Sequence, residues 1–315
     1  MALVSHRDPD PDTIGAALAL GFALETLGKR VSFHCADPVP EHVRFLRGSE
    51  RFTREPPGED VDLVVTVDFG EAERAKFALP ARPPLLNIDH HATNDHFGTA
   101  NLVDATSAAS GELVGRVIDA LGVAWTADMA TAALVAIMTD TGSFQFPNTD
   151  ARALDRAARL REAGADLQAI TYSVFRNKRF EALRLYGAAF SRLVREEGGL
   201  LVWTWIDRRD VEAAEARDED ASGLVEQIAR SSGMRVALLF NGTADAVKIS
   251  CRTSASHPSV DAAALMARFG GGGHVRAAGA IVPGEAALVR ERVLAAARTA
   301  LAEARASEGA RPAPA

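Results

Sequence analysis

The chain has 315 residues, of which 47% are hydrophobic and 24% are charged, and its net charge at pH 7 is −7. Such a composition is typical of a globular protein, and the length is sufficient for two domains. The acidic balance argues against a long nucleic-acid track held by many phosphate contacts, but it allows a small anionic substrate. No apolar run is as long as a membrane span, so no membrane partner is expected.

The cysteines and the N-terminus predict the compartment. Cys35 and Cys251 lie far apart in the sequence and do not form a disulfide framework. The N-terminal segment leads directly into a motif at His6, which leaves no room for a cleaved signal peptide. We therefore expect a cytoplasmic protein.

Short apolar runs alternate with helical patterns in the first half of the chain. Strands are predicted over residues 3–5, 31–34, 63–67 and 85–88, and helices over residues 13–27, 108–121 and 127–138. This alternation predicts an α/β domain with a parallel sheet covered on both sides. In such sheets, ligands bind at the carboxyl ends of the strands.

The pattern changes in the second half and predicts another α/β lobe. Helices are expected over residues 150–163, 166–175 and 180–195, then strands over 200–206, 236–240 and 246–251, and helices over 222–231, 260–268 and 285–307. We expect a catalytic domain over residues 1–175, a helical linker over 176–197, a smaller domain over 198–307 and a disordered tail over 308–315.

The first motif, S-H-R-D-P-D-P-D at residues 5–12, lies between an expected strand and an expected helix. Its two prolines disfavour helix through the turn. The simplest interpretation is a turn in which Asp12 or Thr13 caps the helix. Crowding three carboxylates beside His6 is unfavourable without a cation, however, so the motif favours a metal site that includes Asp10 and Asp12.

Two further aspartates follow apolar segments. Asp68 ends the apolar run of residues 61–67, where a carboxylate is unfavourable unless it is paired or bound to a metal. Asp140 follows an apolar helix, where a carboxylate opposes the helix dipole. The alternative is that both are ordinary turn residues, which is reasonable for Asp68 alone but poor for Asp140.

Asp89, His90 and His91 end the strand expected over residues 85–88. Adjacent histidines at a strand end point in different directions, so one can bind a metal while the other meets a substrate phosphate. Adjacent histidines also occur by chance on surfaces, so the pair alone indicates a site only weakly. Three other histidines lie outside any motif and are predicted to be structural: His34, His42 and His257.

These motifs together resemble those of the DHH phosphoesterase superfamily, which is named for the Asp-His-His string found here at residues 89–91. The second lobe carries F-G-G-G-G-H-V-R-A-A-G at residues 269–279, which is similar to the G-G-G-H-x-x-A-x-G signature of the DHH-associated C-terminal domain. The string S-C-R at residues 250–252 resembles the strand that accompanies this signature. The resemblance covers nearly the whole chain.

The resemblance implies a site for two divalent cations. It assigns one ion to His6, Asp10 and Asp68, and the other to Asp12, Asp68, His90 and Asp140. His91 would face the substrate phosphate, and Asp89 would hold a neighbouring histidine or order the loop. Ligands without thiolate favour Mn²⁺, with Mg²⁺ or Co²⁺ as alternatives. Two such ions are the usual machinery for attack on a phosphate ester.

In the second lobe, the resemblance implies a site for the rest of the substrate. Backbone N–H groups of Gly271, Gly272 and Gly273 would meet an anion, and His274 and Arg252 would donate to a phosphate. The alternative for the glycine run is a flexible loop.

The length of the chain is similar to that of the compact two-domain members, the bifunctional oligoribonucleases and 3′-phosphoadenosine 5′-phosphate phosphatases. This implies hydrolysis of short RNA oligonucleotides to nucleoside 5′-monophosphates and dephosphorylation of that nucleoside bisphosphate to AMP. A cyclic or linear dinucleotide phosphodiesterase is the alternative enzyme, and a non-catalytic nucleotide-binding module is the alternative from another class. The apolar helices would also allow a homodimer.

Overall fold

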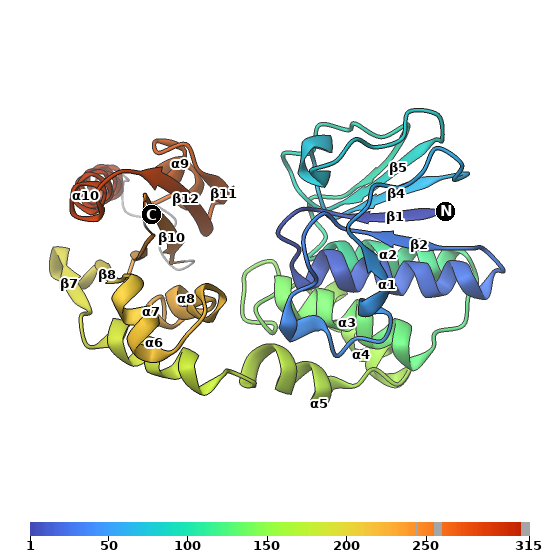
Figure 1. The fold of residues 1–315 in the computed structure, drawn as a ribbon, viewed down its shortest axis with the longest axis horizontal. Coiled ribbons are helices and arrows are strands. Elements are labelled where there is room, and N and C mark those ends of the chain that lie inside the picture. Colours follow the sequence, from blue (N-terminus) through green and yellow to red (C-terminus); the bar gives the residue numbers. More distant parts are fainter. Residues whose placement is uncertain (244, 255–259, 310–315) are drawn as a thin grey trace, which may run out of the picture. The chain divides into compact units, whose positions relative to one another are not determined.

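The computed structural model describes residues 1–243, 245–254 and 260–309 and divides into two compact units, residues 1–177 and 178–315 (Figure 1). The division falls inside the segment expected as a linker. His257 and residues 310–315 of the expected tail lie outside the described residues, and the last helix continues to Gly309.

The first unit is built on a six-stranded sheet in the order β3-β2-β1-β4-β5-β6, with all neighbouring strands parallel. The strands are β1 (Ala2–Ser5), β2 (Ser32–His34), β3 (Phe52–Thr53), β4 (Val64–Val67), β5 (Leu85–Asp89) and β6 (Ala100–Val103). β1 pairs with β2 on one side and with β4 on the other. The chain adds β2 and β3 on one side of β1 and then adds β4, β5 and β6 on the opposite side. Such a switch point opens a crevice at the carboxyl ends of β1 and β4.

Helices cover one face of this sheet (Figure 1). They are α1 (Pro11–Thr26), α2 (Ser110–Ala120), α3 (Ala127–Asp140), α4 (Ala151–Glu162) and α5 (Leu167–Ile170). The core between helices and sheet includes Leu3, Val65 and Ile88. The other face packs against segments that are not α-helical. They contribute Phe69, which follows β4, and Ala75 of the short 3₁₀ helix η3 (Ala72–Ala75). The expected cover on both faces is therefore present, but long helices supply only one side.

The second unit has a mixed six-stranded sheet in the order β11-β12-β10-β9-β8-β7, in which only β8 and β9 are parallel among the described pairs. The strands are β7 (Val194–Glu196), β8 (Leu201–Ile206), β9 (Val236–Gly242), β10 (Ala246–Thr253), β11 (Gly272–His274) and β12 (Ala277–Pro283).

Helices cover both faces of this second sheet. One core includes Leu238, Ile249 and residues of α9 (Ala262–Ala267) and α10 (Ala286–Gly309). The other core packs against the remaining helices, which are α6 (Phe180–Phe190), α7 (Arg208–Ala214) and α8 (Leu224–Ile228). α6 therefore belongs to the core of the second unit.

Some expected elements differ from the structure. The helix expected over residues 166–175 is α5 followed by a π-helical turn, η4 (Thr171–Arg176). The helix expected to reach residue 195 ends at Phe190, and the edge strand β7 follows. The sequence patterns did not predict β3, β6, β7, β11, β12 or α7.

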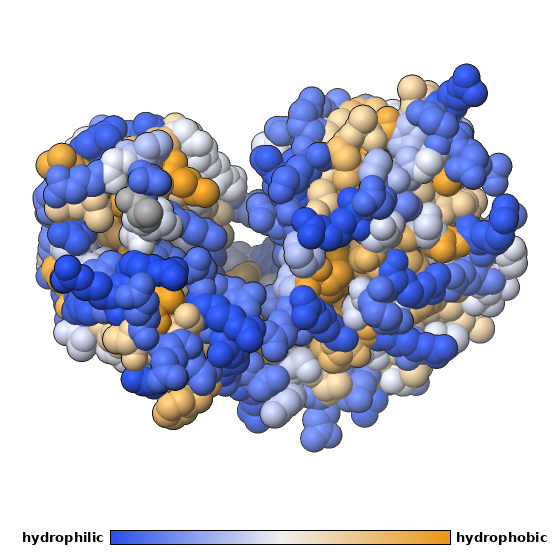
Figure 2. Space-filling model, viewed as in Figure 1, coloured by the Kyte–Doolittle hydropathy of each residue, from blue (hydrophilic) through white to orange (hydrophobic). Residues whose placement is uncertain are grey.

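Among the described residues, no helix combines the length and the apolar character that crossing a membrane requires. Figure 2 shows hydrophobic residues on the visible face of each unit as patches between hydrophilic ones.

Candidate metal centre

The loop after β1 brings a histidine and an aspartate to the carboxyl end of the sheet. His6 is buried, whereas Asp10 is the N-cap of α1, and its Oδ1 accepts hydrogen bonds from the backbone N–H groups of Asp12 and Thr13. His6 Nε2 lies 3.8 Å from the other carboxylate oxygen of Asp10. Asp10 therefore acts as the cap, the role that the simplest interpretation assigned to Asp12 or Thr13, and still faces His6.

Asp68 lies between two histidines. It follows β4 with a left-handed φ of 72°, and its side chain is buried. Its Oδ2 lies 3.5 Å from His6 Nε2, and its Oδ1 lies 3.5 Å from His90 Nε2. The two oxygens of one carboxylate thus face two separate groups of side chains.

The second group gathers around His90. Its Nε2 lies 3.2 Å from Asp140 Oδ2 and 3.8 Å from Asp12 Oδ2. Asp140 is the last residue of α3, and Asp12 is in the first turn of α1. Potential ligand atoms lie within 4.8 Å of one another in three groups: His6–Asp10–Asp68, Asp12–His90–Asp140 and Asp68–His90–His91.

The three histidines are oriented through Nδ1. The Nδ1 atoms lie 2.7 Å from the Arg7 carbonyl for His6, 3.3 Å from the Ser107 carbonyl for His90, and 2.6 Å from Asp89 Oδ1 for His91. Because a carbonyl or a carboxylate only accepts, each Nδ1 is assigned as a donor. In His6 and His90 this directs the Nε2 atom toward the carboxylates, which is the arrangement typical of metal-ligating histidines.

Charge crowding perturbs the pKa values at this site. Burial lowers the pKa of both histidines, but nearby carboxylates outweigh it and raise the pKa to about 10 for His6 and about 11 for His90. Burial, together with other carboxylates, raises the pKa of Asp140 to about 6 and that of Asp12 well above its usual value. Both effects show excess negative charge that a bound cation would offset.

The donor atoms fit divalent cations. Carboxylate oxygens and imidazole nitrogens without thiolate suit hard or borderline ions such as Mn²⁺ and Mg²⁺. The described Asp and His clusters could therefore hold metal, as their chemistry predicted. Cys35 is buried close to His6, but its Sγ donates to the His6 carbonyl at 3.3 Å, and burial raises the pKa of this thiol to about 11.

The sequence patterns missed Ser110, the first residue of α2. Its hydroxyl donates to Asp68 Oδ1 at 2.8 Å, and its backbone N–H donates to Asp12 Oδ2 at 2.8 Å. The Gly111 N–H donates to the other oxygen of Asp12 at 2.9 Å. The N-terminus of α2 thus orients two of the candidate ligands. A serine close to the start of the helix expected over residues 108–121 was the available signal.

Glycines allow the three helices to meet at this point. A Cβ atom on Gly15 of α1 would lie 2.3 Å from the Ala132 carbonyl oxygen of α3. One on Gly111 of α2 would lie 2.4 Å from the Ala136 Cβ atom. Since real Cβ atoms do not approach so closely, larger residues at Gly15 or Gly111 would push the helices apart and displace Asp12 and Ser110.

Asp89 connects the two strand-end histidines. It is fully buried, and its Oδ1 accepts from the backbone N–H of His90 and from the ring of His91. Its Oδ2 accepts from Asn94 Nδ2 at 2.6 Å. Burial raises the pKa of Asp89, but the hydrogen bond from His91 outweighs this and lowers it. Asp89 therefore holds the loop rather than facing the carboxylate clusters.

In the second unit, Arg252 and His274 lie on one face of the sheet. Arg252 on β10 is opposite Ala277 on β12, and Ala277 is opposite His274 on β11. Directly opposed residues project to the same face, so the two side chains are two strands apart, about 10 Å. Arg252 also pairs with Glu226 Oε1 at 2.5 Å and donates to the Cys251 carbonyl.

The glycine run is not the flexible loop given as the alternative, because Gly272 and Gly273 form the edge strand β11 with His274. A Cβ on Gly271 would lie 2.1 Å from the Gly279 carbonyl oxygen. Gly273 has a φ of 139°, and a Cβ there would lie 2.5 Å from the Ala277 carbonyl oxygen. Close packing of the β11–β12 hairpin thus accounts for these two glycines.

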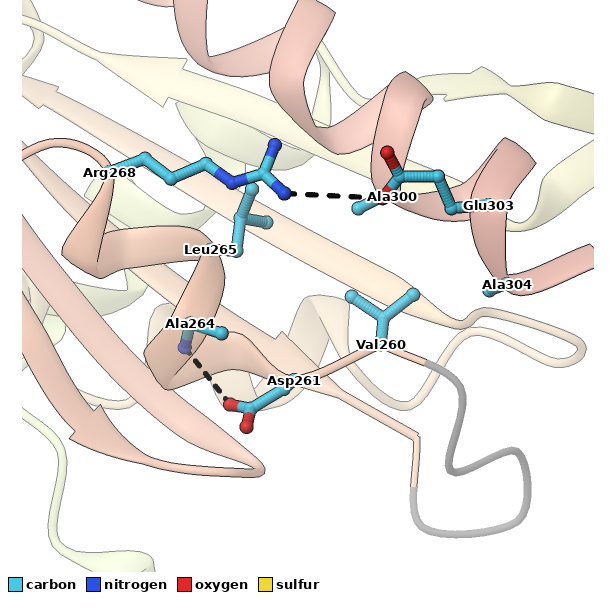
Figure 3. Close-up of a pocket in the computed structure, with 8 residues that line it drawn as sticks. All are labelled: Val260, Asp261, Ala264, Leu265, Arg268, Ala300, Glu303 and Ala304. Carbon is cyan, nitrogen blue, oxygen red and sulfur yellow. Dashed lines mark hydrogen bonds and ion pairs between the residues drawn. The ribbon is translucent and has the colours of Figure 1, made fainter. Parts of the chain in front are cut away.

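A cavity of about 340 Å³ in the second unit contains none of the predicted site residues. It lies between α9 and α10, with Val260 and Ala304 beside it and an ion pair between Arg268 and Glu303 at its edge (Figure 3). Three of its eight lining residues are charged (Asp261, Arg268 and Glu303), and none of the three groups of potential metal ligands found among the described residues lies there.

Comparison with known proteins agrees with this arrangement. A model of the DHH family N-terminal domain matches residues 1–139, and a model of the DHHA1 domain matches residues 207–303. The bifunctional oligoribonuclease and PAP phosphatase NrnA of Thermus thermophilus is 37% identical over 308 residues, which cover 96% of this chain and 90% of that protein. The Bacillus subtilis protein of the same name is 26% identical over 282 residues, covering 88% and 87%.

A solved structure shows the same fold. An exopolyphosphatase-related protein from Bacteroides fragilis superposes with a TM-score of 0.86 at 21% identity, and the match covers 96% of this chain and 91% of that one. Both domain models match in the expected order, and the Thermus thermophilus relative aligns over almost the full length. The chain therefore belongs to the DHH family and carries a C-terminal DHHA1 domain.

Proposed function

We propose that this protein is a phosphoesterase that degrades very short RNA to nucleoside 5′-monophosphates and removes the 3′-phosphate of 3′-phosphoadenosine 5′-phosphate. The observation that carries the proposal is the position of Asp68, whose two oxygens each lie 3.5 Å from a different histidine and so connect two carboxylate–histidine groups. The 37% identity to a bifunctional oligoribonuclease and PAP phosphatase supports the substrate class.

His6, Asp10 and Asp68 would hold one divalent cation, and Asp12, Asp68, His90 and Asp140 would hold the other, with Mn²⁺ preferred. Bound cations would supply positive charge to the phosphoryl oxygens and lower the pKa of an attacking water.

His91 would meet the phosphate as a hydrogen-bond donor. Burial lowers its pKa, but the hydrogen bond to Asp89 and the charge of Asp68 outweigh burial and raise the pKa. Asp89 thus favours the protonated ring, whose second nitrogen would donate to a phosphoryl oxygen as negative charge develops there. Asn94 in turn orients Asp89 through its amide.

In the DHHA1 domain, Arg252 and His274 would bind the remaining part of the substrate. Both are cationic or hydrogen-bonding groups on one sheet face, and arginine can hold a phosphate through two parallel hydrogen bonds. Gly271, Gly272 and Gly273 would contribute by keeping the hairpin backbone close to the ligand.

Product analysis with Mn²⁺ tests the proposal. The substrates would be a labelled RNA dinucleotide, a long single-stranded RNA, 3′-phosphoadenosine 5′-phosphate and cyclic di-adenylate, with Asp68→Ala as the inactive control. We expect rapid turnover of the dinucleotide and the bisphosphate and slow turnover of the long RNA. Turnover confined to cyclic di-adenylate would instead indicate a cyclic dinucleotide phosphodiesterase, and no turnover of any substrate would indicate a binding module.

A further inference from the structure

The turn after α3 has an unusual backbone. Gly142, Ser143 and Phe144 have φ angles of 56°, 59° and 64°, so three successive residues are left-handed. This conformation is unfavourable for residues other than glycine, and such strain is concentrated at functional sites. The turn begins directly after Asp140, whose carboxylate lies 3.2 Å from His90.

Hydrogen bonds hold the strained turn in place. The buried Thr141 accepts at its carbonyl from the N–H groups of Gln145 and Phe146, both at 2.9 Å, and at its hydroxyl from the Phe144 N–H at 3.1 Å. Asn148 Nδ2 donates to the carbonyls of Asp140 and Ala108, both at 3.0 Å. The turn is therefore a rigid part of the site.

This rigid turn displays an aromatic ring. Phe146 is 52% exposed, although Phe144, two residues earlier, packs against the core of the unit. The Phe146 ring lies against the backbone of Gly142, because a Cβ atom there would be 2.5 Å from the ring. One side of the ring is thus supported by the main chain four residues earlier, while much of its surface remains available.

We propose that Phe146 is a stacking surface for a nucleobase of the substrate, which rests on the proposed function. An aromatic ring held beside a phosphate-reacting site suits a base because every base has a π-face, so stacking tolerates any sequence. The ring is close in the chain to Asp140, so it would bind the nucleotide adjacent to the reacting phosphate. Such stacking would favour nucleotides over simple phosphate esters as substrates.

Kinetics of Phe146→Ala on two substrates test this assignment. One substrate is an RNA dinucleotide, and the other is the same dinucleotide with an abasic residue in place of one base, each position being replaced in turn. Loss of one stacking contact predicts a KM about 5- to 150-fold higher for the intact dinucleotide with kcat little changed. When the abasic residue replaces the base that stacks on Phe146, wild type and variant should have the same KM.

Two further variants complete the experiment. Leu154→Ala removes an equally exposed apolar side chain, 51% exposed on α4, and should leave both KM values unchanged. Phe146→Trp should retain KM, and AMP should quench its added fluorescence beyond any change in the wild type. An equal KM effect on intact and abasic substrates, or no quenching by AMP, would overturn the assignment.

The outcomes separate the two proposals. If the wild type hydrolyses neither dinucleotide, the proposed function is wrong, while AMP titration of Phe146→Trp still decides whether this turn stacks a base. If the wild type is active and Phe146→Ala behaves like it on every substrate, only the stacking assignment is wrong.

Discussion

The two units present their functional side chains in different ways. In the first unit, His6, Asp68 and His90 follow strands at the carboxyl edge of a parallel sheet and are held by hydrogen bonds in a largely buried setting. In the second unit, Arg252 and His274 lie within antiparallel strands and are more exposed, and Arg252 already pairs with Glu226.

Under the proposed function, this difference would separate bond chemistry from substrate binding. Buried, pre-oriented carboxylates have few alternatives and hold a fixed arrangement, which suits metal binding and catalysis. Arg252 and Glu226 are half-buried, and the arginine could exchange this carboxylate for a phosphate, to which it can donate two parallel hydrogen bonds. We therefore expect substitutions in the first unit to affect turnover and metal affinity, and those in the second unit to affect KM.

Asp68→Asn should have the largest effect. It keeps the size of the side chain but removes the negative charge shared by both clusters. The rate on an RNA dinucleotide should therefore fall by more than about 100-fold, which is the largest loss expected for a residue that only supports a ligand. Asp128→Asn, an exposed carboxylate paired with Arg47, is the control and should retain the rate. A rate within a few-fold of wild type would exclude Asp68 as a shared ligand.

Ser110→Ala should have the next largest effect. Loss of its hydrogen bond to Asp68 should weaken metal binding by about 10- to 100-fold, and calorimetric titration of the metal-free protein with Mn²⁺ measures this directly. Ser49→Ala, which removes another buried serine hydrogen bond in the same unit, should leave metal affinity unchanged. Equal affinities in the two variants would mean that the Ser110 hydroxyl is only structural.

Arg252→Ala should raise KM by about tenfold and leave kcat nearly unchanged. This corresponds to the lower end of a charged hydrogen bond, about 1.5 kcal/mol, because Glu226 already occupies one guanidinium nitrogen. Steady-state kinetics on the dinucleotide provide the measurement, with Arg208→Ala on α7 as the control. A fall in kcat without a change in KM would place Arg252 in the chemistry rather than in binding.

The last prediction concerns stability without metal. The raised pKa values of His6, about 10, and His90, about 11, mean that the folded protein binds more protons than the unfolded chain above pH 6.5. The stabilisation that these two histidines contribute to the folded protein is therefore complete below pH 6.5 and is lost as pH rises toward 10. The raised pKa of Asp12 changes the stability in the same direction.

Hydrogen exchange with a chelator present, followed over this pH range, measures the effect in each unit. Peptides from residues 1–177 should lose protection as pH rises, and saturating Mn²⁺ should suppress the loss because metal ligands must be deprotonated. Peptides from the second unit should not respond to metal. Rising protection of the first unit in the chelator would show that the carboxylates do not stabilise the protonated histidines.

The amino-acid pattern alone identifies the side chains that follow strands. Apolar runs before His6, Asp68 and Asp89 identified β1, β4 and β5 to within a residue, because buried parallel strands are continuous apolar segments with sharp ends. The rule that ligands bind at the carboxyl edge then placed these side chains together. The short strands β3 and β11 were not predicted, although β2 of similar length was, since two or three residues rarely show a period.

The contacts that hold these residues come from segments far apart in the chain. The bond from Ser110 to Asp68 spans 42 positions, and that from its N–H to Asp12 spans 98, so no local pattern reports them. The sequence left the glycine run open between an anion site and a flexible loop, whereas the structure shows that close backbone approach in the β11–β12 hairpin requires Gly271 and Gly273. Local propensity identifies the candidates, but packing between distant segments selects their partners.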